Sequence, residues 1–142
     1  MIIDTTYLLP LSRISIDTDL LGSIDAGRIK LAFSDIGIST ISLFELQAKS
    51  AKLRVPAKFT IEAMEVINSE FRVEHFYNPK IIEISHILSR QLHDYIDCII
   101  LGTAIALKED LVTEDSKLMD IKKQVWEKYR INLFNYKDLK TK

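Results

Sequence analysis

The chain alternates between short apolar runs and longer stretches in which apolar residues recur every three or four positions. Short apolar runs bounded by turn residues are typical of buried strands, and the longer pattern is typical of helices that cover a sheet. The sequence predicts strands at 1–4, 36–41, 71–76, 111–113 and 131–134. Residues 71–76 alternate apolar with polar side chains, which indicates a half-buried strand near a sheet edge.

The predicted helices lie between these strands. They cover residues 5–9, 20–29, 42–55, 57–69, 79–92, 98–107 and 116–128. Strands that alternate with helices predict right-handed crossovers, a mostly parallel sheet and helices on both of its faces. We therefore expect an α/β fold with one domain at 1–136 and a solvated C-terminal tail at 137–142.

Residues 98–107 are apolar or small on every side, so a helix there would be buried all round. The run is too short to span a bilayer, which needs about 20 such residues. Cys98, the single cysteine, lies in this run and is expected to be a core thiol. One cysteine excludes an internal disulfide and any zinc site built from several cysteines.

Composition restricts the class of protein only mildly. Of the 142 residues, 47% are hydrophobic and 27% are charged, which is an ordinary globular balance. The formal net charge of -1 excludes a bulk electrostatic grip on nucleic acid, but not a nucleic-acid enzyme in which metal ions supply positive charge locally. The first residues do not have the pattern of a signal peptide, so we expect a cytoplasmic protein with no membrane partner.

Acidic residues follow the ends of the predicted strands. Asp4 ends the first strand, Glu45 lies in the helix after the second, Asp97 lies near the start of the buried helix, and Asp115 follows 111–113. In an open parallel sheet the ligand site lies outside the C-terminal ends of the strands, so these carboxylates should meet at one edge. Close carboxylates repel unless a cation is present, and oxygen ligands without His or Cys suit Mg²⁺ or Mn²⁺. Such an ion can activate a water and clamp a phosphodiester.

Two of these assignments have alternatives. Ser42 and Glu45 have the spacing of a capping box, in which Glu45 would only support the start of a helix. Asp94 stands three residues before Asp97 and is either a further metal ligand or an N-cap.

Other polar and aromatic residues carry weaker signals. Lys49 and Lys52 lie one and two turns after Glu45, where they would contact substrate phosphates or simply form a solvated helix face. The histidines lack metal-ligand spacing and are expected at the surface or an interface: His75, His86 and His93. Four aromatic residues are expected in the core or a dimer interface, not as platforms for base stacking: Phe44, Phe59, Tyr95 and Trp126.

Four segments in this order together resemble the PIN-domain family, which includes VapC-like toxin ribonucleases and related archaeal and bacterial PIN nucleases. The segments are Ile2-Ile3-Asp4-Thr5-Thr6, Ile41-Ser42-Leu43-Phe44-Glu45-Leu46, His93-Asp94-Tyr95-Ile96-Asp97 and Leu111-Val112-Thr113-Glu114-Asp115. The resemblance covers essentially the whole chain. It implies a three-layer α/β/α sandwich and a divalent-metal-dependent endoribonuclease, a hydrolase that cleaves the phosphodiester bonds of RNA.

The resemblance also implies roles for individual residues and partners. The catalytic and metal-binding residues would be Asp4, Glu45, Asp97 and Asp115, with Asp94 as a further candidate ligand. Thr5 and Thr113 would orient these carboxylates through their hydroxyl groups. Homodimers are frequent in the family, and its toxins pair with a small antitoxin protein. Where the family often has a basic residue, this chain has Glu114, which would weaken RNA contact or point away from the site.

Two competing functions remain open at this point. Phosphatases that use an aspartate after the first strand need a second aspartate two residues later, and Thr6 stands there, which strongly disfavours that class. A non-catalytic scaffold or interaction subunit with the same fold is the alternative that the sequence leaves in place.

Overall fold

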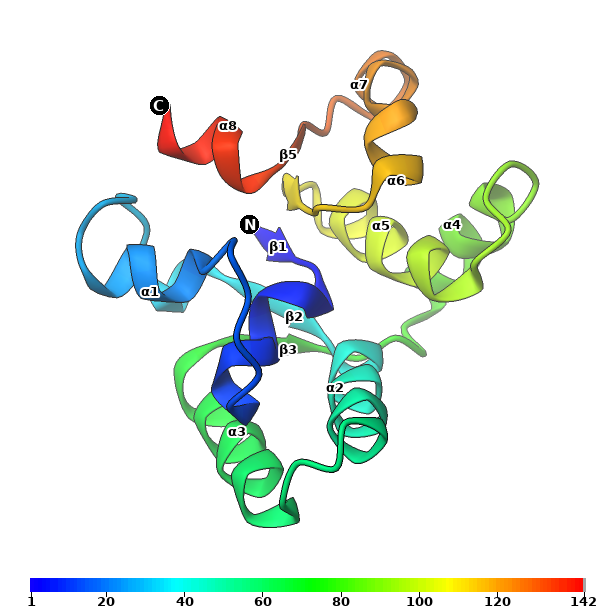
Figure 1. The fold of residues 1–142 in the computed structure, drawn as a ribbon. Coiled ribbons are helices and arrows are strands. Elements are labelled where there is room, and N and C mark those ends of the chain that lie inside the picture. The colour runs from blue at the N-terminus through cyan, green and yellow to red at the C-terminus, as the bar shows by residue number, and fades with distance from the viewer. Residues whose placement is uncertain (142) are drawn as a thin grey trace.

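The computed structural model of the protein describes residues 1–141, which form one parallel five-stranded sheet covered by helices on both faces (Figure 1). The strands are β1 (Ile2–Ile3), β2 (Gly37–Ser39), β3 (Arg72–Glu74), β4 (Leu111–Val112) and β5 (Leu133–Phe134). Their spatial order is β3-β2-β1-β4-β5, and each neighbouring pair is parallel. The predicted parallel α/β/α sandwich is therefore confirmed, with β3 at a sheet edge as its alternating pattern indicated.

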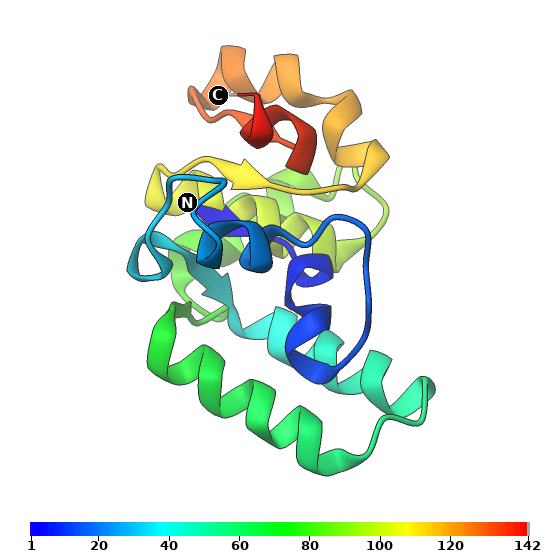
Figure 2. The same ribbon diagram turned by 60° about the vertical axis from the view of Figure 1, so that its left-hand side comes forward.

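The helices connect the strands in sequence order. They are the 3-10 helices η1 (Thr5–Ser12) and η2 (Phe33–Asp35), and the α-helices α1 (Leu20–Asp25), α2 (Thr40–Lys52), α3 (Ala57–Glu70), α4 (Pro79–Leu88), α5 (Tyr95–Leu107), α6 (Ser116–Asp120), α7 (Lys122–Tyr129) and α8 (Tyr136–Lys140). Figure 2 shows the C-terminal helices at the β5 end of the sheet and α2 and α3 at the β3 end.

The sheet separates two hydrophobic cores, because successive side chains in a strand point to opposite faces. Ile3 and Val112 join the core formed with η1, α1, α2, α3 and α8. Ile2 and Leu111 join the core formed with α4, α5, α6 and α7. Neighbouring residues of β1 and β4 thus point to opposite faces of the sheet, and each face is covered by its own layer of helices.

Helix α5 is the most deeply buried helix, and its sequence explains why. Residues 98–105 are all buried, and the Asp94 side chain caps the helix by accepting a hydrogen bond from the Ile96 backbone N–H at 2.9 Å. Gly102 allows α5 to approach α4, because a Cβ at this position would lie 2.8 Å from the Ser85 hydroxyl oxygen. Cys98 is fully buried, which confirms the predicted core thiol.

The start of α2 differs from the prediction. The second strand ends at Ser39, which is also the N-cap of α2: its hydroxyl accepts from the Ile41 backbone N–H at 3.2 Å. Ser42 therefore lies inside the helix with its side chain fully buried, and the capping-box interpretation of Ser42 and Glu45 is wrong. Glu45 is left with a side chain that is available for another role.

Two other helices are shorter or broken. The predicted helix at 20–29 ends at Asp25, because Gly27 adopts a positive φ of 75° that turns the chain out of the helix. The predicted helix at 116–128 is divided at Ile121, which ends α6 and precedes α7.

The C-terminal segment that was predicted to be a solvated tail at 137–142 contains a helix. Residues 136–140 form α8, which begins with a capping box between Asn135 and Asp138. Leu139 is buried in the hydrophobic core, so α8 packs onto the domain. Lys137, Lys140 and Thr141 are exposed, and residue 142 lies outside the described residues.

No helix within residues 1–141 combines the length and apolar character that crossing a bilayer would require.

Candidate active site

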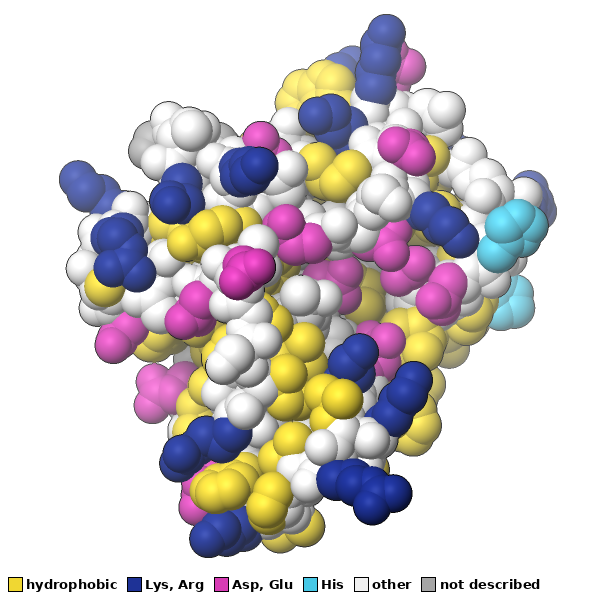
Figure 3. Space-filling view, in the orientation of Figure 1, with side chains coloured by type: hydrophobic (Ala, Val, Ile, Leu, Met, Phe, Trp, Pro, Cys, Tyr) yellow, Lys and Arg dark blue, Asp and Glu magenta, His cyan; other side chains and the backbone are white. Residues whose placement is uncertain are grey.

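Four acidic side chains come from four different elements at the C-terminal ends of the strands. Asp4 directly follows β1, Glu45 lies in α2 after β2, Asp97 lies in the first turn of α5, and Asp115 is the N-cap of α6 after β4. Figure 3 shows Asp and Glu side chains gathered across the middle of this face, with Lys and Arg side chains around them. The parallel order of β2, β1 and β4 is what collects them.

Asp4 is the most tightly held of these carboxylates. Its side chain is only 8% exposed. Its Oδ1 accepts a hydrogen bond from the Thr5 backbone N–H at 2.7 Å, and its Oδ2 accepts one from the Thr113 hydroxyl at 2.7 Å. Burial raises the pKa of Asp4, the two hydrogen bonds oppose that rise, and the charges of Asp115 and Asp94 add to it.

Glu45 is oriented by the Thr5 hydroxyl, which lies 2.5 Å from Glu45 Oε1 and 2.9 Å from the Ser42 hydroxyl oxygen. Because the Thr5 hydroxyl carries one proton, donation to Glu45 leaves its lone pairs to accept from Ser42. Burial raises the pKa of Glu45, the Thr5 hydrogen bond lowers it, and the charges of Asp4 and Asp94 raise it. Thr5 thus holds Asp4 with its backbone and Glu45 with its side chain.

Asp97 has a strongly perturbed carboxyl group. Its pKa is raised from 3.8 to about 7, first by burial and then by the charges of Asp115, Asp94, Asp4 and Glu45. Within the described residues, the ion pairs involve only Met1, Arg72, Glu74 and Glu109, so no basic side chain neutralises this group.

Asp115 and Asp94 each spend one oxygen on capping a helix. Asp115 Oδ1 accepts from the Leu118 backbone N–H at 3.0 Å, and the Asp115 backbone N–H donates to the Thr113 hydroxyl at 3.1 Å. Asp94 is the N-cap of α5, and its charge also raises the pKa of Asp4, Glu45 and Asp97. The N-cap alternative for Asp94 is therefore confirmed, and its charge belongs to the electrostatics of the site.

The donor set fits a hard divalent cation by its chemistry, because it offers only carboxylate and hydroxyl oxygens. Within residues 1–141, no three His, Cys, Asp or Glu side chains are already placed to hold a metal ion together. Binding would therefore require the less constrained carboxylates, such as that of Asp97, to rotate toward an ion.

Sequence reasoning missed two residues beside this site. Ser42 is a buried partner of Thr5, and Tyr7 is a fully buried residue whose hydroxyl donates to Glu114. Glu114 also accepts from the Tyr136 backbone N–H at 2.8 Å, so this acid is directed away from the other carboxylates. Ser42 was hidden by its capping-box spacing, and the Tyr7 contact joins residues 107 positions apart, which no local pattern indicates.

The remaining candidates lie at the surface. Lys49 and Lys52 are exposed in the last turn of α2, and neither forms an ion pair with the acidic group. Phe44, Tyr95 and Trp126 are 63%, 42% and 43% exposed, so they are not core residues, and a dimer interface stays the prediction for them.

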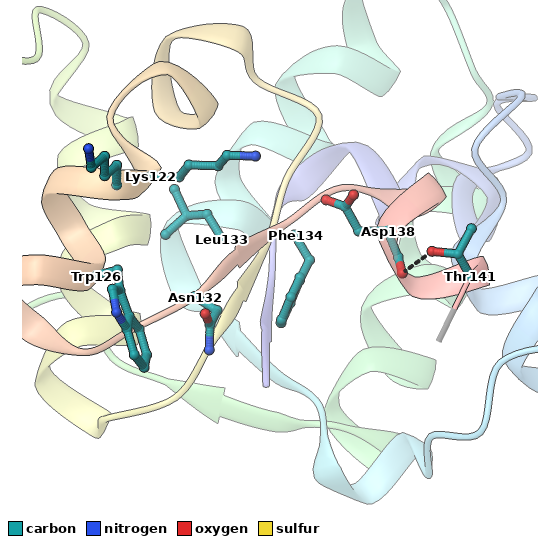
Figure 4. Close-up of a pocket in the computed structure, with 8 residues that line it drawn as sticks. Lys122, Trp126, Asn132, Leu133, Phe134, Asp138 and Thr141 are labelled. Atoms are coloured by element: carbon teal, nitrogen blue, oxygen red, sulfur yellow. Dashed lines mark hydrogen bonds between the residues drawn. The ribbon is translucent and has the colours of Figure 1, made fainter.

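One cavity of the molecule is separate from the carboxylates. It has a volume of about 490 Å³ and lies between α7, β5 and α8 (Figure 4). Its lining includes Lys122, Trp126, Asn132 and Asp138, and none of the four acidic site residues. Asp138 is engaged in the capping box of α8, and the Arg130 guanidinium lies 5.5 Å from the centre of the Trp126 ring.

The parallel sheet with acidic residues at its C-terminal edge is the arrangement expected of a PIN domain, and comparison with known proteins agrees. The PIN domain model matches residues 1–124, so the chain belongs to the PIN domain family. No curated protein matches the chain.

Two solved structures share the fold. A toxin-antitoxin complex from Klebsiella pneumoniae aligns with a TM-score of 0.57 and 21% identity over 82% of this chain and 87% of that chain. VapBC2 from Rickettsia felis, bound to a DNA fragment from its promoter, aligns with a TM-score of 0.66 and 20% identity over 94% of this chain and 96% of that chain. At these identities the likeness concerns the fold.

Proposed function

We propose that the protein is a divalent-metal-dependent endoribonuclease that hydrolyses phosphodiester bonds of RNA and acts as the toxin of a toxin-antitoxin pair. The observation that carries the proposal is the meeting of four carboxylates from four elements, with the pKa of Asp4, Glu45 and Asp97 raised and no basic partner among the described residues. Perturbed pKa values of this kind gather at functional sites. Membership of the PIN domain family, whose members are generally nucleases, supports the same reaction class.

Asp4, Glu45, Asp97 and Asp115 are the residues that would hold Mg²⁺ or Mn²⁺, with Asp94 near enough to add its charge. Such an ion supplies a water of lowered pKa and stabilises charge on the phosphodiester. The carboxylates would supply the negative field that draws a cation into a protein of net charge -1.

Some of the acidic side chains are held in place by hydrogen bonds, whereas Asp97 changes its protonation state. Thr113 and Thr5 fix both oxygens of Asp4, and Thr5 also fixes Glu45, so this half of the site is preorganised. Asp97 carries a proton on about half of the molecules near pH 7, because its pKa is about 7. Cation binding would displace that proton, so binding should be tighter at higher pH.

RNA is the proposed substrate, and its phosphates would meet the exposed Lys49 and Lys52 beyond Glu45 on α2. A homodimer is the expected assembly. Both solved structures described above are toxin-antitoxin complexes, which supports a small antitoxin protein as the proposed partner.

The proposal is tested by incubating the purified protein with single-stranded RNA in Mg²⁺, in Mn²⁺ and in EDTA. We expect cleavage with either ion and none in EDTA. Asp4→Asn and Asp97→Asn should each lower the rate by at least about 100-fold, because loss of a metal ligand removes several kcal/mol of transition-state stabilisation. Asp25→Asn, which changes an exposed aspartate at the end of α1, is the matched control and should cleave like the wild type.

Cleavage that survives EDTA, or that is unchanged in both site variants, would refute the metal mechanism. Absence of any cleavage by a protein that still binds a partner would favour the non-catalytic scaffold.

A further inference from the structure

The C-terminal helix is joined to the acidic site through Glu114. The Glu114 carboxylate accepts the Tyr7 hydroxyl proton and the Tyr136 backbone N–H with the same oxygen, Oε2. Residues 135–140, meaning the N-cap Asn135 and helix α8, are called the C-terminal clasp below. Through Glu114, the clasp and η1 are both fastened to the turn that leaves β4.

The clasp is itself well anchored to the domain. Its capping box fixes the first turn of α8, with the Asn135 N–H donating to Asp138 at 2.9 Å and the Asp138 N–H donating to Asn135 at 2.9 Å. Leu139 is buried in the core. The Tyr136 hydroxyl lies 2.7 Å from the hydroxyl of Ser23, which is fully buried in α1. Because α8 is anchored in this way, the Tyr136 backbone N–H holds Glu114 in a defined position.

Glu114 stands between two residues of the site. Thr113 donates its hydroxyl proton to Asp4 and accepts from the Asp115 N–H, so the turn 113–115 sets the positions of both carboxylates. Residues 113–115 are thus held by Asp4 through the Thr113 hydroxyl, and by Tyr7 and Tyr136 through the Glu114 carboxylate.

We propose that Glu114 and Tyr7 are positioning residues, which use the C-terminal clasp to fix Thr113 and Asp115 for binding of the divalent ion. This inference rests on the proposed metal-dependent nuclease function. It makes α8 a working part of the site.

The alternative is that Glu114 acts directly, as a further ligand or as a charge that repels RNA. One observation speaks against direct action. The Glu114 carboxylate is already engaged by the Tyr7 hydroxyl and the Tyr136 backbone N–H. Burial raises the pKa of Tyr7 most, and the hydrogen bond and charge of Glu114 and the charge of Asp4 raise it further.

The test compares Tyr7→Phe with Tyr129→Phe. The first removes only the hydroxyl that reaches Glu114, and the second removes a hydroxyl from α7 that makes no hydrogen bond within the described residues. The Mn²⁺ dissociation constant is measured by calorimetry, and kcat and KM are measured on single-stranded RNA, at a temperature where all variants are folded. Tyr7→Phe should weaken Mn²⁺ binding and lower kcat by about tenfold, the low end for residues that orient metal ligands, with KM within about twofold.

Variants of Glu114 provide the second arm. Glu114→Gln keeps an oxygen that can accept from Tyr7 and Tyr136, so it should retain more Mn²⁺ affinity than Glu114→Ala. A direct electrostatic role predicts instead that Glu114→Gln and Glu114→Ala have equal Mn²⁺ affinity, because both variants lack the charge.

The outcomes are distinct. If wild-type protein neither binds Mn²⁺ nor cleaves RNA, the proposed function fails and the positioning role fails with it. If the wild type does both and Tyr7→Phe matches Tyr129→Phe in Mn²⁺ affinity and kcat, only the positioning role is overturned, whatever the change in thermal stability.

Discussion

Within residues 1–141, carboxylates are ion-paired at one end of the parallel sheet and unpaired at the other. At the N-terminal ends of the strands, Glu109 is paired with the Met1 ammonium group and with Arg72 at 2.5 Å, and Arg72 also approaches Glu74 at 3.3 Å. At the C-terminal ends, Asp4, Glu45 and Asp115 lie close enough to Asp97 for their charges to raise its pKa, and no ion pair reaches these carboxylates within the described residues.

The pKa values record this difference. Burial alone would raise the pKa of Glu109, but the hydrogen bonds from Arg72 and the Met1 ammonium group hold it below its usual value. Burial and neighbouring carboxylates raise the pKa of Asp97 to about 7. Equally acidic groups thus stabilise the fold at one end and strain it at the other, which is the pattern expected when one end is kept for function.

The first prediction removes the charge of Glu109 at the end where carboxylates are ion-paired. Glu109→Gln should lower the free energy of unfolding by about 1 kcal/mol, since it removes a partly exposed charge-assisted contact to Arg72. The cost should shrink as the pH falls: Glu109 has a lowered pKa, so its contribution is present above the ordinary pKa of 4.5 and is lost when the carboxylate is protonated in the folded state. Urea unfolding at several pH values measures it.

Glu127→Gln on α7 is the matched control, because Glu127 is exposed and forms no ion pair with any residue of 1–141. A loss of stability in the control equal to that in Glu109→Gln would show that the paired end is not special.

The second prediction concerns the end where carboxylates repel one another, and here a substitution should raise stability instead of lowering it. The folded protein binds the Asp97 proton more tightly than the unfolded chain, so without added metal its stability should fall as the pH rises from 3.8 to about 7. Asp97→Asn removes this penalty and should raise the melting temperature at pH 8 but not at pH 3. The gain should be smaller than the Glu109 effect, at most about 4 °C, because solvent screens this half-buried group.

Melting curves in EDTA across this pH range measure the effect. Equal melting temperatures for the wild type and Asp97→Asn at pH 8 would mean that the carboxylates do not strain the fold.

Much of the fold could be read from local patterns. Helix α5 was predictable because Asp94 precedes a run that is apolar on every side, and β4 because a short apolar run ends at Thr113. Asp4, Glu45 and Asp115 could be assigned to one sheet edge because they follow the ends of β1, β2 and β4, which the observed strand order places side by side, and Asp97 because it lies at the start of the buried helix α5. The metal role of these residues stays a prediction.

What sequence reasoning missed depends on contacts between distant residues. Ser42 fits a cap in the sequence, yet Ser39 caps the helix and leaves Ser42 to contact Thr5, which is 37 positions away. The tail was judged by its charged residues, but one buried leucine, Leu139, and a capping box are enough to form α8. Glu114 could not be oriented from sequence because both of its partners are set by the tertiary fold.

The most direct test of the central claim is anomalous scattering from crystals soaked in Mn²⁺. The account predicts a Mn²⁺ peak bounded by Asp4, Asp97 and Asp115, with Glu45 directed toward it, and no such peak in crystals of Asp4→Asn. A Mn²⁺ peak elsewhere, or no Mn²⁺ peak in wild-type crystals soaked in the same way, would contradict the claim that this edge of the sheet is a metal-dependent active site.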